Sequence, residues 1–91
     1  MKVLLIHENN HGVIGVVKDV NSAVSFLIKE NWLNEKTSIC YDNGDDYEWG
    51  TVEKAYGKDW EHFLRSLTIG LFNEIWEDCF YLEEEEVFGT P

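Results

Sequence analysis

The chain has 91 residues, enough for one domain with a modest hydrophobic core, and we expect residues 1–91 to form that single domain. Hydrophobic residues make up 44% of the chain and aromatic residues 14%, a composition that is typical of a folded protein and argues against a disordered one. Only 7 Lys and Arg stand against 18 Asp and Glu, which makes direct nucleic-acid binding improbable because phosphate contacts need clustered basic side chains.

The N-terminal third of the sequence predicts a β-hairpin followed by an amphipathic helix. Two apolar, β-rich runs, Lys2–His7 and Gly12–Lys18, are separated by a short polar turn. After them, apolar residues recur at the spacing of one helix face: Val20, Ala23, Val24, Leu27 and Ile28. We expect a long helix here, with Asn21 or Ser22 as its N-cap and Asn34 in a left-handed turn at its end.

A second strand pair and a short helical turn are predicted next. The runs Thr37–Tyr41 and Tyr47–Val52 have strand composition, and the Asn43–Gly44 step between them favours a tight turn. Thr51 is a suitable residue to begin one short helical turn, and Gly57 to end it.

Two further helices are predicted in the C-terminal half. Asp59 is expected to cap the first of them, and Thr68 to start the second. The first would bury Trp60, Phe63, Leu64 and Leu67, and the second Phe72, Ile75 and Trp76, with Cys79 as a further candidate. The four large aromatic residues in this set are therefore expected to belong to the core.

The end of the chain has two readings. In FYLEEEEVF the apolar residues Phe80, Leu82 and Phe88 share the parity of a strand, although a helix continuing to Glu86 is an alternative. With the strand included, the predicted fold class is α+β. It would have an antiparallel sheet of four to five strands, one long amphipathic helix after the first hairpin, and two to three helices in the C-terminal half.

The sequence predicts a soluble protein of the cytoplasm. No segment approaches the roughly 18 consecutive apolar residues of a membrane helix, and the run Val3–Ile6 is too short for a signal peptide. Cys40 and Cys79 have no metal-like spacing, so two reduced, partly buried thiols are expected, with a disulfide as the alternative.

Neither catalysis nor a cofactor is expected. The chain contains no GxSxG elbow, no glycine-rich phosphate loop and no HExxH motif. A calcium loop is suggested by Asp42, Asp46 and Glu53 at positions one, five and twelve of an EF-hand. The match fails because Gly44 stands where a ligand is needed and Tyr47 where the turn requires glycine. We therefore expect no metal site and no enzyme.

The net negative charge of the protein comes from one part of the sequence. Residues 1–41 contain four lysines and four acidic residues, so their net charge is zero. Residues 42–91 contain 3 basic and 14 acidic residues and carry the whole net charge of −11. Such an asymmetry bears on the choice of binding partners more than on the fold.

Aromatic residues alternate with the acids in this second part, as an interface with desolvated anchors and a basic partner would require. Tyr47 and Trp49 are the best candidates for exposed anchors. The candidate partner-binding residues are Asp42, Asp45, Asp46, Tyr47, Glu48, Trp49, Glu77, Asp78, Glu83, Glu84, Glu85 and Glu86. An alternative for the four consecutive glutamates is an edge strand that charge protects from aggregation.

Two stretches, HGVIGVVKDVNSAVSFLIKENWL and LTIGLFNEIWEDCFYLEEEEVF, resemble small accessory proteins of phages and prophages of Gram-positive bacteria. The likeness covers most of the chain. Many such proteins counter host defences. Anti-CRISPR proteins, anti-restriction proteins and inhibitors of uracil-DNA glycosylase are often small and acidic because they occupy a nucleic-acid groove.

The resemblance implies a phage-encoded inhibitor that acts in the host cytoplasm. We hypothesise that its acids converge into one DNA-mimicking surface, which occupies the basic nucleic-acid-binding cleft of a host protein. The alternative is a structural or regulatory interaction domain, for example a homodimer that buries the exposed aromatic residues, in which the acidity only maintains solubility.

Overall fold

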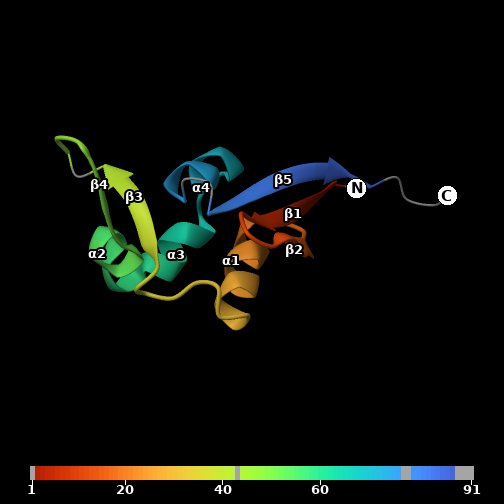
Figure 1. The fold of residues 1–91 in the computed structure, drawn as a ribbon, viewed down its shortest axis with the longest axis horizontal. Coiled ribbons are helices and arrows are strands. Elements are labelled where there is room, and N and C mark those ends of the chain that lie inside the picture. Colours follow the sequence, from red (N-terminus) through yellow and green to blue (C-terminus); the bar gives the residue numbers. More distant parts are fainter. Residues whose placement is uncertain (1, 43, 77–78, 88–91) are drawn as a thin grey trace.

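A computed structural model describes residues 2–42, 44–76 and 79–87, and shows an α+β fold (Figure 1). In chain order the elements are β1 (Lys2–Glu8), β2 (Gly12–Val17), α1 (Val20–Lys29), β3 (Ser38–Asp42), β4 (Tyr47–Thr51), α2 (Val52–Tyr56), the 3₁₀ turn η1 (Gly57–Asp59), α3 (Trp60–Arg65), α4 (Ile69–Ile75) and β5 (Phe80–Glu86). Within the described part of the chain, no helix has the length and apolar character needed to cross a membrane.

The strands form two sheets, so the expectation of one sheet of four to five strands is wrong. An antiparallel three-stranded sheet has the order β2-β1-β5, and β3 pairs only with β4. The two sheets lie toward opposite ends of an elongated molecule whose extents are 51 × 25 × 25 Å (Figure 1). Helix α4 lies between them and contacts both β5 and β3.

Residues 80–86 form a strand and do not continue the preceding helix. β5 pairs with β1 along its whole length, from Lys2 opposite Glu86 to Glu8 opposite Phe80. The side chains alternate as a strand requires, because Phe80 and Leu82 are buried while Tyr81 between them is exposed. The predicted third member of this parity, position 88, lies outside the described residues.

Helix α1 begins two to three residues earlier than expected. Its N-cap is Asp19, in place of Asn21 or Ser22, because the extended backbone of Asp19 lets its carboxylate accept a hydrogen bond from the Ser22 N–H at 2.7 Å. The backbone hydrogen bond from Ser22 lowers the pKa of the Asp19 carboxyl. The ionised form therefore contributes stability at neutral pH, and this contribution is lost as the pH falls through the lowered pKa.

Helix α1 also ends early, so the expectation of a long helix is wrong. It has ten residues, and the left-handed residue beyond its end is Asn31 (φ 64°) rather than Asn34. The backbone N–H groups of Trp32 and Leu33 both turn back to the carbonyl of Leu27, which closes the helix. The following residues then cross to the second sheet.

One continuous hydrophobic core joins the elements. Its buried members are Leu4, Ile6, Ala23, Val24, Leu27, Leu33, Ile39, Val52, Trp60, Leu64, Phe72, Trp76, Phe80 and Leu82. The predicted helix stripe of α1 supplies three of them, and Trp60, Phe72 and Trp76 confirm three of the four aromatic residues assigned to the core. The fourth assignment is wrong, because Phe63 is 41% exposed and stacks on the ring of Tyr56.

The C-terminal helices follow the predicted capping pattern in part. Thr51 and Thr68 cap α2 and α4 with their side-chain oxygens, and Gly57 ends α2 with φ 78°. Asp59 precedes α3 without a side-chain capping bond, because a 3₁₀ turn already leads into that helix. Cys79 is exposed and does not point into the core, and neither cysteine forms a disulfide.

A single amide side chain holds α4 against the outer edge of β5. The Asn73 side chain accepts a hydrogen bond from the Leu82 N–H at 2.7 Å and donates one to the Leu82 carbonyl at 3.1 Å. This is the pattern that a neighbouring strand would make, so Asn73 occupies part of an edge that would otherwise be open to strand pairing. The contact is partly buried.

Candidate functional site

The structure does not bring the predicted acidic residues together. The β3–β4 hairpin and the glutamate-bearing end of β5 lie at opposite ends of the long axis (Figure 1). The expectation of one continuous anionic surface is therefore wrong, because β5 returns along β1 and carries its glutamates away from the hairpin. Positions 77 and 78, which were predicted to extend this surface, lie outside the described residues, as does the side chain of Asp42.

The acids of β5 are spread over two faces of the sheet. Glu83 and Glu85 share one face and Glu84 and Glu86 the other, as strand alternation requires. Two of these acids have basic neighbours: Glu83 lies 3.1 Å from the His7 side chain, and Glu84 lies 3.3 Å from the Lys2 ammonium group. The glutamates at this end of the molecule therefore lie on two faces of the sheet, and Glu83 and Glu84 have basic side chains beside them.

At the other end, the hairpin combines exposed acids with exposed aromatic side chains. Tyr47 is 71% exposed and Trp49 54%, and both project from the same face of β4 because they are two residues apart. Asp45 and Asp46 lie exposed in the adjoining turn. We refer to Asp45, Asp46, Tyr47 and Trp49 as the hairpin surface. Sequence reasoning identified all four.

Glu48, the remaining predicted hairpin residue, has an internal role. Its carboxylate accepts a hydrogen bond from the Tyr41 hydroxyl and lies 3.6 Å from the Lys54 ammonium group. The hydrogen bond to Glu48 is the main reason why the pKa of Tyr41 is raised, so this phenol remains a neutral donor. Glu48 therefore positions Tyr41 across the strand pair and contributes less to an external contact.

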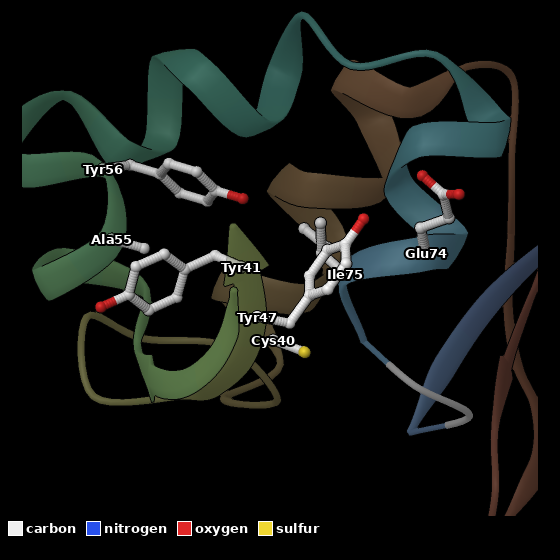
Figure 2. A pocket seen from close by; sticks show the side chains of 7 residues that line it. All are labelled: Cys40, Tyr41, Tyr47, Ala55, Tyr56, Glu74 and Ile75. Carbon is white, nitrogen blue, oxygen red and sulfur yellow. The ribbon is translucent and has the colours of Figure 1, made fainter. Parts of the chain in front are cut away.

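A pocket of about 570 Å³ adjoins the hairpin surface, within the range of about 300–1,000 Å³ that is usual for small-ligand sites. It lies where β3, β4, α2 and α4 meet. Its lining residues, which we call the tyrosine pocket, are Cys40, Tyr41, Tyr47, Ala55, Tyr56, Glu74 and Ile75. Figure 2 shows the Tyr47 and Tyr56 hydroxyls pointing toward the space that Glu74 borders, whereas the Tyr41 hydroxyl points away from α4.

Two of the three tyrosine rings are held by their neighbours. Tyr56 stacks on Phe63 with ring centroids 4.1 Å apart and is partly buried, which raises the pKa of its hydroxyl. Tyr41 lies against Gly50, where an added Cβ would approach the ring to 3.0 Å. The absence of a side chain at Gly50 therefore leaves room for the Tyr41 ring. Tyr47 is the third tyrosine of the lining, and most of its surface is exposed.

The pocket has a polarity that restricts its ligands. Among the residues that the structure describes, its lining includes one carboxylate, from Glu74, and neither a lysine nor an arginine. No group of three or more His, Cys, Asp or Glu residues arranged to hold a metal ion is present among residues 2–42, 44–76 and 79–87. The aromatic rings and the Glu74 carboxylate can contact an apolar or cationic group.

Sequence reasoning missed this pocket. Tyr56, Ala55, Glu74 and Ile75 were not selected, because each sits in a short helix with no motif around it. The one local signal is the use of tyrosine, rather than phenylalanine, at positions 41, 47 and 56. Comparisons of the chain with protein-family models, curated proteins and solved structures gave no match.

Proposed function

We propose that this protein is a non-catalytic inhibitor that binds a basic surface of another protein through the hairpin surface. The observation that supports this function is the exposure of Tyr47 and Trp49 directly beside Asp45 and Asp46. Large aromatic side chains that a partner desolvates contribute strongly to binding, while acids around them select for a basic partner.

The partner that we propose is a nucleic-acid-binding protein of a Gram-positive bacterial host, and the inhibitor is phage-encoded. This follows from the resemblance to phage accessory proteins and from the net charge of −11, which opposes binding to nucleic acid itself. Because the acids of the hairpin and of β5 are far apart, the proposed contact is local. The hairpin would enter the basic cleft and compete there for arginine and lysine side chains, without mimicking a long stretch of DNA.

A capture experiment with matched charge variants tests this function. The tagged protein is incubated with a nuclease-treated extract of a Gram-positive bacterium at low salt, and bound proteins are identified by mass spectrometry. We expect recovery of a nucleic-acid-binding protein that is released at about 1 M salt, where the Debye length is only about 3 Å. The double variant Asp45→Asn, Asp46→Asn should lose at least tenfold in affinity for it.

The double variant Glu83→Gln, Glu85→Gln is the matched control, since it removes the same charge from the other end of the molecule. We expect it to retain binding within about threefold, as is usual for charges outside a contact. Equal losses for both double variants would show that only net charge matters. Recovery of no nucleic-acid-binding protein would contradict the proposed partner.

A homodimeric interaction domain is the second candidate, and one feature of β2 favours it. β2 is an edge of the three-stranded sheet, and its six residues Gly12–Val17 carry no charge and no proline. Val13 and Val16 are 49% and 60% exposed. A second copy could pair with β2 about a two-fold axis, because the edge is open and belongs to the part of the chain that has no net charge.

For this candidate we expect a dimer in sedimentation velocity at about 50 μM protein, and a monomer after Val16→Lys, since a lysine on an edge strand opposes pairing. Leu71→Lys is the control, because it replaces another exposed apolar residue away from β2. A monomeric wild-type protein would exclude the dimer. A dimer that persists in Val16→Lys would exclude β2 as its interface.

A further inference from the structure

The tyrosine pocket is formed by side chains from four separate elements, and two of its rings are already fixed. Tyr41 comes from β3, Tyr47 from β4, Tyr56 from α2 and Glu74 from α4. Phe63 supports the Tyr56 ring, and Glu48 holds the Tyr41 hydroxyl. Because these two rings are already held, less ordering is needed when a ligand enters, which favours binding.

The wall chemistry favours a cation over other ligands. Aromatic faces attract cations through their quadrupole, and Glu74 adds a full negative charge at the border of the same space (Figure 2). An anion would be repelled by Glu74, and the described lining residues include no lysine or arginine to bind it. The pocket also belongs largely to the part of the chain that carries the net charge of −11. A neutral apolar ligand would fill the pocket but would leave the carboxylate without a partner.

Resting on the proposed function, we propose that the tyrosine pocket receives an arginine side chain of the partner protein, with its guanidinium group stacked on tyrosine and paired with Glu74. A planar guanidinium both stacks on aromatic faces and forms paired hydrogen bonds with a carboxylate. A lysine ammonium group is more strongly hydrated and lacks this planar geometry. The exposed ring of Tyr47 belongs both to the hairpin surface and to the pocket, so a partner docked on the hairpin is adjacent to the opening.

The arginine site is tested with short peptides, independently of the unidentified partner. The full chain, labelled with ¹⁵N and with ¹³C at tyrosine, is titrated with acetyl-Gly-Arg-Gly-amide and followed by NMR. We expect saturable shifts at the rings of Tyr47 and Tyr56 and at the backbone amide of Glu74. Acetyl-Gly-norleucine-Gly-amide, which has a similar length and no charge, should bind at least fivefold more weakly, and the lysine peptide at least threefold.

The variant Glu74→Gln should weaken the arginine peptide at least fivefold, while Glu53→Gln should not, because Glu53 is an exposed glutamate of α2 that does not line the pocket. Superimposable spectra of the free variants would establish that both remain folded. The proposal is overturned if the norleucine or lysine peptide binds equally well, if Glu74→Gln binds like the wild type, or if about 20 mM arginine peptide produces no shift. Such a failure would leave the capture experiment unaffected, since that experiment depends on Asp45 and Asp46.

Discussion

Replacing Trp76 with alanine is expected to lower the free energy of unfolding by about 3–5 kcal/mol. Trp76 is fully buried and follows α4 at the junction with β5. Its ring contacts Phe72 at a centroid distance of 5.5 Å and Phe80 at 5.6 Å. A domain of this size has a total stability of about 5–15 kcal/mol, so the variant should be far less stable in urea denaturation followed by circular dichroism.

Two other tryptophan variants provide controls for this experiment. Trp49→Ala should change the stability by less than about 1 kcal/mol, because its side chain is half exposed. Trp76→Phe should lose less than about 2 kcal/mol, since it keeps an aromatic ring and removes an indole N–H that finds no acceptor among the described residues. Similar losses in Trp49→Ala and Trp76→Ala would contradict the assigned core.

Replacing Asn73 with alanine is the second large change, with an expected loss of about 1–3 kcal/mol. The variant removes both hydrogen bonds to the Leu82 backbone, and Leu82 is itself buried. It also uncovers an edge of β5, so we expect a greater tendency to self-associate. Urea denaturation measures the loss of unfolding free energy, and light scattering at increasing protein concentration measures self-association.

The control for Asn73 is Asn10→Ala, which changes an exposed asparagine in the turn between β1 and β2. Its expected effect is within about 0.5 kcal/mol, as for most surface positions. If Asn73→Ala were equally harmless, water would replace its two hydrogen bonds at no cost, and the side chain would not be needed to hold α4 on the sheet.

Local signals predicted the individual elements well. The α1 stripe, the two hairpin pairings and the capping threonines Thr51 and Thr68 depend on residues that are near each other in sequence. The predicted turn residue at position 43 lies outside the described residues. The boundaries of α1 were harder to predict, because several residues near each end have side chains that can cap a helix. Asp19, rather than its polar neighbours, took the extended backbone of an N-cap, and Asn31 took the left-handed conformation three residues before Asn34.

Long-range pairing could not be predicted from local patterns. The pairing of β1 with β5 joins the two ends of the chain, and the alternation of Phe80 and Leu82 indicates a strand without indicating its partner. This pairing directs the glutamates of β5 away from the β3–β4 hairpin. Charge along the sequence therefore identified residues suited to binding, including Tyr47 and Trp49, but not their arrangement in space.

The candidate site had the same limitation. Its hairpin part is contiguous in sequence and was predicted, whereas the pocket requires α2 and α4 to meet the strand pair. Neither helix exceeds seven residues, so neither carries enough periodicity to reveal which side faces the hairpin. Tertiary packing determines which side of each helix faces the hairpin. The position of Glu74 in the pocket lining is therefore visible only in the three-dimensional structure.

Helix α4 links the edge of the three-stranded sheet to the wall of the tyrosine pocket. Two consecutive residues of this helix contact different sheets, since Asn73 is bonded to β5 while Glu74 lines the pocket beside β3. A local opening of the helix would detach the sheet edge and dismantle the pocket wall in the same event. The lifetimes of the covered sheet edge and of the pocket would thus both depend on the fraying of α4 and not on global unfolding.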